Sequence, residues 1–138
     1  MLVYDDAPKA LEFLCDAFGF EEKMRMPMAD GRIGHAEIAM DGAVVMLASC
    51  WTPAGMKSPQ ELAGVHGQIC CVVDDVDAHY RRAVAAGARI AHGLRDYFWS
   101  DEGHRTYEAL DPEGHRWRFH QWLREVPQSE RRGRPGED

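Results

Sequence analysis

The chain has 138 residues, of which 45% are hydrophobic and 28% are charged, and its formal net charge at pH 7 is −7. These values are typical of a globular domain, and no apolar run approaches the ~18 residues that a membrane-spanning helix needs. The acidic balance argues against nucleic-acid binding, which requires clustered Lys and Arg. It favours cationic ligands, although solubility is the simpler explanation of the charge. The first residues lack a signal-peptide pattern, so we expect a cytoplasmic protein that binds neither nucleic acid nor membrane.

The first elements along the chain are predicted to be a strand, a helix and three strands. Residues 1–4 form a short strand, and Asp6 before Pro8 is a good start for a helix that carries apolar residues at helical spacing until Gly19. Three strands follow, over residues 20–28, 35–40 and 43–50, and the last of them is expected to be buried. Asp41-Gly42 between the last two is a strong hairpin signal.

The same order recurs after a linker over residues 52–64, which is rich in Gly and Pro. The predicted elements are a strand over 67–74, a helix over 76–86, a short strand over 88–91, an irregular stretch over 92–103, a strand over 105–110, a turn over 111–114 and a strand over 115–123. The charged segment 124–138, also rich in Gly and Pro, is expected to be a disordered tail.

The acidic doublet Asp5-Asp6 and the doublet Asp74-Asp75 lie about 70 residues apart, and each precedes a predicted helix and further strands. This register indicates a tandem duplication of a βαβββ module, with repeats at about residues 1–51 and 66–123 of a single domain, 1–123. The predicted class is α+β, with the two modules forming a cupped mixed sheet whose first strand is short or truncated. The concave face of such a sheet is a natural pocket.

The doubled βαβββ order, the helix start after Asp5-Asp6 and the segment Asp111-Pro112-Glu113-Gly114-His115-Arg116-Trp117 together resemble the vicinal oxygen chelate superfamily. This group contains glyoxalases, bleomycin resistance proteins and extradiol dioxygenases, and the chain is most similar to uncharacterised glyoxalase-like members. The resemblance covers residues 1–123 and implies a homodimer that takes a small molecule in the cup. Because the superfamily includes both enzymes and drug-binding proteins, it does not by itself fix an activity.

Enzymes of this superfamily hold a divalent metal through His or Glu side chains, and the resemblance places three of the ligand positions on Met46, Gln68 and Arg118, with a fourth at or before Leu2. None of these residues is His or Glu. A guanidinium only donates hydrogen bonds, and a thioether is too soft for a hard cation. We therefore predict no cofactor, and keep a divalent metal held by His35, Glu37 and His120 as the alternative.

Alternation along the strands predicts which side chains face the cup. The candidate ligand-binding residues are His35, Glu37, Met46, Gln68, Trp99, Glu108, Arg118 and His120. His35 and Glu37 could be a general base with its orienting carboxylate or a hydrogen-bonded polar pair, and Glu108 with Arg118 could be a cross-strand ion pair. Trp99 could stack on a planar ligand or pack against its neighbours.

The favoured function is binding and sequestration of a small molecule without the conventional metal. The alternatives are a lyase or dioxygenase that uses a shifted His/Glu metal site, and a metal-free acid/base isomerase built on His35. The four cysteines show no Cys-x-x-Cys spacing and are expected to be reduced.

Overall fold

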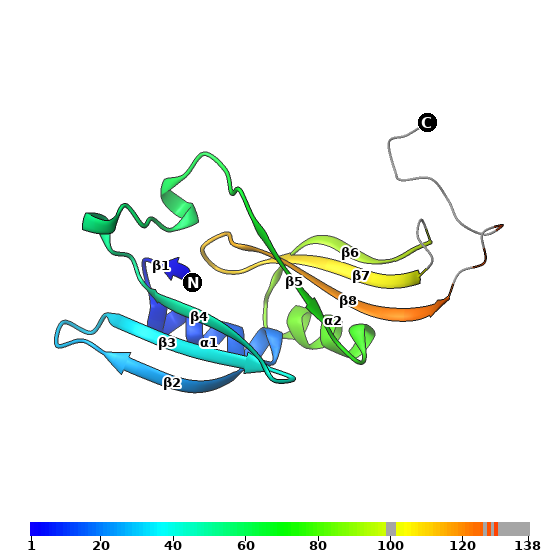
Figure 1. Ribbon diagram of the computed structural model, residues 1–138, viewed down its shortest axis with the longest axis horizontal. Coiled ribbons are helices and arrows are strands. Elements are labelled where there is room, and N and C mark those ends of the chain that lie inside the picture. The colour runs from blue at the N-terminus through cyan, green and yellow to red at the C-terminus, as the bar shows by residue number, and fades with distance from the viewer. Residues whose placement is uncertain (99–101, 126, 128, 130–138) are drawn as a thin grey trace.

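Two four-stranded mixed sheets, each backed by one helix, make up the protein (Figure 1). The computed structural model describes residues 1–98, 102–125, 127 and 129. The first module contains β1 (Leu2–Tyr4), α1 (Ala7–Phe18), β2 (Glu21–Pro27), β3 (Ile33–Met40) and β4 (Ala43–Ser49). The second contains β5 (Gln68–Val72), α2 (Val76–Ala85), β6 (Arg89–Tyr97), β7 (Glu102–Leu110) and β8 (Arg116–Glu125). The strand orders, β1-β4-β3-β2 and β5-β8-β7-β6, are the same in both modules, which confirms the predicted tandem βαβββ class.

Both helices begin at the predicted aspartates. The Asp6 side chain accepts a hydrogen bond from the Lys9 amide at 3.1 Å, and the Asp75 side chain accepts one from the Ala78 amide at 2.8 Å. These caps satisfy amides that the first helical turn leaves without partners. Gly19 closes α1 with φ of 76°, a left-handed conformation that glycine adopts without a Cβ clash.

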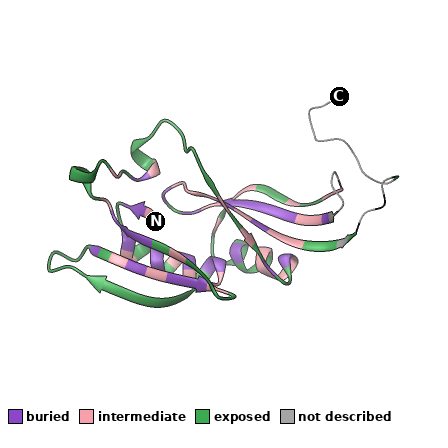
Figure 2. Cartoon of the chain, viewed as in Figure 1, coloured by how far each residue is buried: buried purple, intermediate pink, exposed green. Residues whose placement is uncertain are grey.

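The Asp41-Gly42 turn also forms as predicted, because both residues have positive φ, 48° and 82°, as a two-residue turn between twisted strands requires. The neighbouring strand β4 differs from the prediction. Only its second half is buried, whereas Val44 and Met46 are exposed, since one face of the first sheet has no helix over it (Figure 2).

Within the stretch 92–103, predicted to be irregular, residues 92–97 and 102–103 are strand. β6 extends to Tyr97 and β7 begins at Glu102. Two register shifts in the β6–β7 pairing, between Ile90 and His92 and between His92 and Arg95, break the period-2 pattern by which a strand is recognised in a sequence. That interruption is the physical reason why this prediction was wrong.

The Asp111–Gly114 turn ties the two modules together. The buried Asp111 carboxylate accepts hydrogen bonds from the amides of Glu113, Gly114 and His115 at 3.0–3.1 Å through Oδ1. Its Oδ2 accepts from the Tyr4 hydroxyl of β1 at 2.7 Å and from the Trp117 indole at 3.1 Å. Burial, and then the Asp111 charge, raise the pKa of Tyr4 well above its usual value, so the phenol remains a donor.

Two further residues join the modules. Glu113 accepts from the amides of Asp5 and Asp6 at 2.6 and 2.9 Å, so the turn of the second module holds the helix start of the first. His79 of α2 lies 2.6 Å from the Tyr107 hydroxyl and 2.7 Å from the Phe18 carbonyl oxygen. Around these bonds Phe18, Phe119 and Trp117 pack as ring contacts of one shared core.

β8 reaches Glu125, two residues beyond the predicted end of the last strand. The rest of the predicted tail lies outside the described residues, apart from Pro127 and Ser129. Among the described helices, none is both long and apolar enough to cross a membrane.

Candidate functional site

The free face of the first sheet is rich in methionine. The pairing of Glu37 with Met24 and Met46, and of His35 with Met26, places these side chains on one face because paired residues share a side of a sheet. Ala36 and Ile38, which point the other way, are fully buried against α1. The predicted orientation of His35, Glu37 and Met46 is therefore the one observed.

His35 and Glu37 are the polar pair of this face. His35 Nε2 lies 3.1 Å from Glu37 Oε1, and both side chains are about one-third exposed. The contact positions the imidazole, and it leaves the second ring nitrogen for another partner. The pair is thus assembled as predicted, on a largely apolar surface.

The free face of the second sheet is cationic. Glu108 of β7 is 6% exposed and accepts hydrogen bonds from Arg118 at 2.5 and 3.1 Å and from Arg116 at 3.1 Å. Arg95 of β6 lies further out, 3.8 Å from the same carboxylate and over the Tyr97 ring. We call these four charged residues, Arg95, Glu108, Arg116 and Arg118, the arginine cluster.

The charges of the arginine cluster fix the ionisation of Glu108. Burial alone would raise the pKa of Glu108, but the hydrogen bond and charge of Arg118, helped by Arg116 and His92, outweigh it and hold the pKa below its usual value. The Glu108 hydrogen bond in turn raises the pKa of Arg118. One carboxylate therefore faces three permanent cations.

His120 continues this face along β8. Its ring stacks on that of His104 with centroids 5.4 Å apart. Burial, followed by the charges of His104 and Arg118, lowers the pKa of His120, so its imidazole is neutral near pH 7. A neutral imidazole offers one donor and one acceptor to a ligand.

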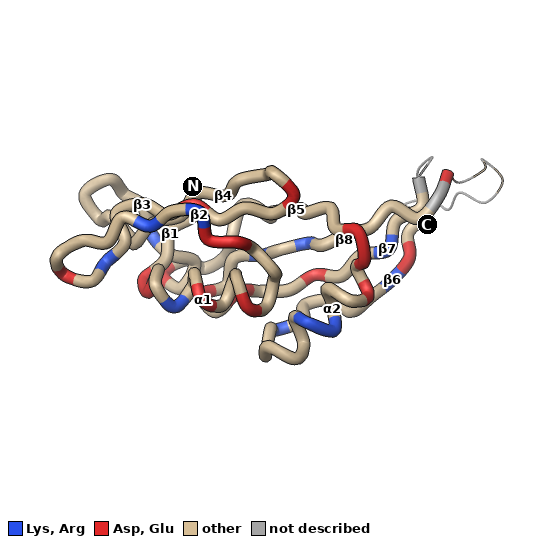
Figure 3. Tube along the Cα trace, turned by 90° about the horizontal axis from the view of Figure 1, so that it is seen from below, with Lys and Arg blue, Asp and Glu red and all other residues tan. Residues whose placement is uncertain are grey.

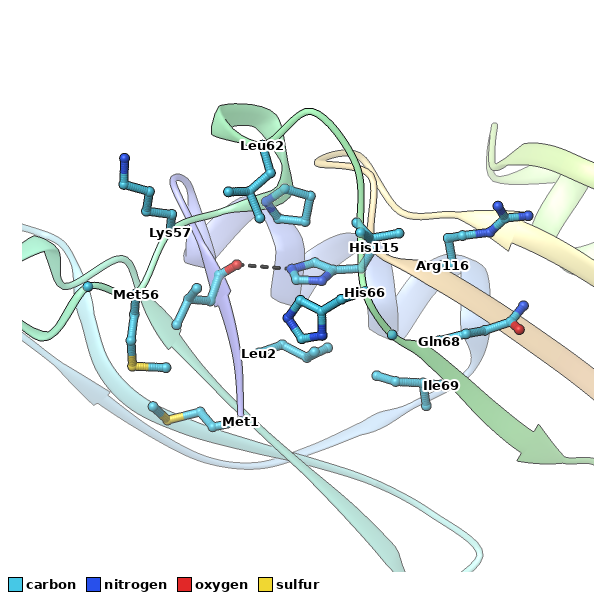
Figure 4. A pocket seen from close by; sticks show the side chains of 15 residues that line it. Met1, Leu2, Met56, Lys57, Leu62, His66, Gln68, Ile69, His115 and Arg116 are labelled. Atoms are coloured by element: carbon cyan, nitrogen blue, oxygen red, sulfur yellow. Dashed lines mark hydrogen bonds between the residues drawn. The ribbon is translucent and has the colours of Figure 1, made fainter.

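A pocket of about 610 Å³ lies between the two modules, beside the arginine cluster. Its walls come from β1, from the linker and from the start of β5, and Figure 4 shows Met1, Leu2 and Met56 on one side and Gln68 and Arg116 on the other. The lining is mainly apolar, with Leu62, Val65 and Ile69 as further members. His115 is fixed here because its Nε2 lies 3.0 Å from the Val3 carbonyl oxygen (Figure 4).

A second, more open hollow of about 590 Å³ covers the arginine cluster. It shares Val65, His66, Gly67, Gln68 and Arg116 with the apolar pocket. The two hollows are therefore neighbours with a common wall, one apolar and one cationic.

The predicted site residues divide between the two sheets. His35, Glu37 and Met46 lie on the first sheet, and Gln68, Glu108, Arg118 and His120 on the second. Trp99 lies outside the described residues. The structure adds lining residues that the sequence did not indicate. They are chiefly Met56 and Leu62 from the linker, His66 just before β5, and Arg95 from the part of β6 predicted to be irregular. The linker lacks any periodic pattern that could have identified its inward-facing side chains.

The residues present do not fit the divalent metal of the superfamily's enzymes. Met46 offers a thioether, Gln68 an amide, and Arg118 a guanidinium already bonded to Glu108. In the part of the chain that the structure describes, no three His, Cys, Asp or Glu side chains converge as a metal site would require. The alternative set is also dispersed, since His35 and Glu37 belong to β3 and His120 to β8.

The acidic net charge is distributed unevenly. Basic positions lie along β6, β7 and β8 of the second sheet (Figure 3), and three of them belong to the arginine cluster. The expectation of a cationic ligand rested on net charge alone, and the local charge of this face is the opposite.

Comparisons with known proteins identify a family and several relatives of this chain. The family model for the "Glyoxalase/Bleomycin resistance protein/Dioxygenase superfamily" matches residues 1–119. The uncharacterised protein Mb0911c of Mycobacterium bovis is 39% identical over 132 residues, which cover 94% of this chain and 85% of that protein. The uncharacterised protein Rv0887c of Mycobacterium tuberculosis is 39% identical, over 94% of this chain and 76% of its own.

Two solved structures extend the comparison. TioX from Micromonospora sp. ML1 has a TM-score of 0.69 and 38% identity, covering 88% of this chain and 94% of TioX. TnmS3, described as an antibiotic binding protein from Streptomyces sp. CB03234, has a TM-score of 0.64 and 23% identity, covering 88% of this chain and 91% of TnmS3. At 23% identity, the likeness to TnmS3 shows a shared fold and nothing more specific.

Proposed function

Because the chain belongs to the glyoxalase/bleomycin resistance protein/dioxygenase superfamily, we propose that it binds a small organic molecule between its modules and sequesters it without the conventional divalent metal. The observation that carries this proposal is the apolar pocket of about 610 Å³. Its volume suits a drug-sized ligand, and its mixture of apolar walls with a few polar groups is typical of ligand sites. The description of TnmS3 as an antibiotic binding protein supports the same class of ligand.

Contacts within the pocket explain how a ligand would be held. Leu2, Leu62 and Ile69 would cover apolar ligand surface, and each 100 Å² removed from water contributes about 2.5 kcal/mol before the entropic cost of binding. Met56 and Met1 have flexible thioether side chains that adapt to ligand shape. Gln68 and His66, at the common wall, would supply directional hydrogen bonds.

We propose that the active form is a homodimer in the cytoplasm. The free faces expose large apolar side chains, among them Val72 at 65%, Met26 at 55% and Val44 at 51%, and apolar area of this kind marks contact surfaces. Such a contact would enclose the ligand further. The four cysteines form no disulfide, which suits a reducing compartment.

The test is a thermal-shift screen of apolar and planar antibiotics and aromatic acids, with two glycine variants as a matched pair. Gly67 belongs to the common wall, whereas Gly93 lies on β6 and lines neither hollow, and neither has an atom within 4 Å of the position of an added Cβ. A ligand at ~100 times its Kd stabilises the native state by about 2.7 kcal/mol. We expect G67L to abolish the shift of a hit and G93L to retain it.

Hits whose shift survives G67L would place binding elsewhere and contradict the proposal. Elemental analysis of protein purified without a His tag tests whether the protein works without a divalent metal. About one tightly bound divalent ion per subunit would contradict metal-free binding and favour the lyase or dioxygenase alternative.

A further inference from the structure

We propose that the ligand of this site carries an oxyanion, such as a carboxylate, which the arginine cluster binds while the apolar part of the same molecule occupies the neighbouring pocket. This inference rests on the proposed function, because it specifies the chemistry of the molecule that the pocket takes. Its basis is the charge and geometry of the free face of the second sheet.

The cluster has positive charge that its own carboxylate does not neutralise. Arg95, Arg116 and Arg118 surround Glu108 at 3.8, 3.1 and 2.5 Å. Three guanidinium groups around one carboxylate repel one another, and a further bound anion would relieve that repulsion. Partial burial lowers the local dielectric constant and so strengthens both the repulsion and the attraction to an anion. The cluster therefore favours a second anion.

The guanidinium groups keep donors available for that anion. Arg118 directs Nε and one Nη to Glu108, whereas Arg116 gives it a single Nη and Arg95 no hydrogen bond. A guanidinium carries several N–H donors in a fork that matches a carboxylate. Arg95 and Arg116 are each 41% exposed, so their remaining donors are accessible from the cationic hollow.

Arg116 links the two parts of the site. It lines both the apolar pocket and the cationic hollow, and in Figure 4 its side chain extends from the pocket toward the second sheet. A molecule with an apolar ring and an attached carboxylate would fill both hollows at once. A purely apolar or cationic molecule would leave the arginine cluster without its anion.

Two other arginines of the second module differ from the cluster. Arg105, on the opposite face of β7, is matched by two carboxylates, Asp96 at 2.7 Å and Asp77 at 3.2 Å. Arg89 donates to the Asp111 carbonyl oxygen at 3.1 Å. Excess positive charge is thus a property of the hollow beside the pocket and not of every arginine in this module.

The experiment compares 2-naphthoate with the neutral 2-naphthamide, two molecules of nearly equal shape, by isothermal titration calorimetry at low salt. Wild type should bind the naphthoate about tenfold more tightly, the equivalent of ~1.4 kcal/mol, and added salt should reduce the difference. R95Q and R116Q should each remove most of this preference. R81Q, which removes the same charge from the exposed surface of α2, should retain it.

R95Q should leave the hydrogen bonds of Glu108 intact, because Arg95 lies 3.8 Å from that carboxylate and makes no hydrogen bond to it. Thermal unfolding of each variant checks that it folds. Equal binding of both compounds, unaffected by R95Q and R116Q, would overturn the anion inference and leave the proposed function standing. Failure of both compounds to bind wild type at millimolar concentration would overturn the inference together with the proposed pocket. A preference retained in R95Q and R116Q but lost in R81Q would also refute it.

Discussion

The substitution D111N tests how the two modules are held together. Asp111 is fully buried and accepts five hydrogen bonds, three from backbone amides through Oδ1 and two through Oδ2 from Tyr4 and Trp117. An asparagine has nearly the same shape, but one of its terminal atoms is an NH₂ that can only donate. Whichever way the amide is oriented, donors then face donors.

The five hydrogen bonds to Asp111 set the loss of stability expected for D111N. With the NH₂ in the Oδ2 position, the Tyr4 hydroxyl can rotate to accept, whereas the Trp117 indole cannot, and the charge that strengthened all five bonds is gone. An unsatisfied buried donor costs about 1–3 kcal/mol, and a hydrogen bond to a charged group contributes about 1.5–3 kcal/mol. We expect D111N to lower the free energy of unfolding by about 3 kcal/mol, which corresponds to a fall of about 10 °C in Tm.

The measurement is urea denaturation followed by circular dichroism, with Y4F as the companion variant. Y4F removes one donor to a charged acceptor and leaves the carboxylate its other four bonds, so we expect a loss of about 1.5 kcal/mol, the lower end of the range for such a bond. The Y4F D111N double variant should lose less than the sum, because the two side chains share a bond. A D111N protein no less stable than Y4F would refute this account of the junction.

Three further predictions concern ionisation and assembly. E108Q should cost about 1–2 kcal/mol at pH 7. Because the folded pKa of Glu108 is lowered, that difference should be lost as pH falls through the folded pKa, and a difference that is constant in acid would contradict the pairing. Burial lowers the pKa of His79, so wild type should lose stability as pH falls below the ordinary histidine range while H79Q should lose less, as thermal unfolding between pH 7.5 and pH 5 can measure. If the protein is the proposed homodimer, V72E should lower the mass measured by light scattering, whereas V84E, at an exposed position on α2, should leave it unchanged. Equal behaviour of the two variants would exclude the free face of the second sheet as the contact surface.

Much of the fold could be predicted because its signals are local. Asp6 and Asp75 are caps whose partners lie three residues away, and the Asp41-Gly42 turn depends only on the φ values of two residues. The sheet faces followed from alternation, which placed Glu108 and Arg118 on the same side of the second sheet, where the two residues pair. These features need no knowledge of the tertiary structure.

The remainder depends on contacts that no local pattern encodes. Arg95 was missed because bulges in β6 interrupt the alternation, and Met56 and Leu62 because the linker has no period. The partners of Asp111 span more than a hundred residues of sequence, from Tyr4 to the last strand. The pocket arises where β1, the linker and β5 meet, and only the assembled chain brings them together.

Methyl NMR of protein labelled with [methyl-¹³C]methionine shows most directly whether a small molecule binds between the modules. Met56 lines the pocket, whereas Met40 packs against the core near α1. Titration with the best compound of the screen should shift the Met56 methyl resonance in a saturable way and leave Met40 unchanged, and G67L should remove the response. A compound that stabilises the protein without moving Met56, or that moves both methyl groups equally, would contradict binding at this pocket.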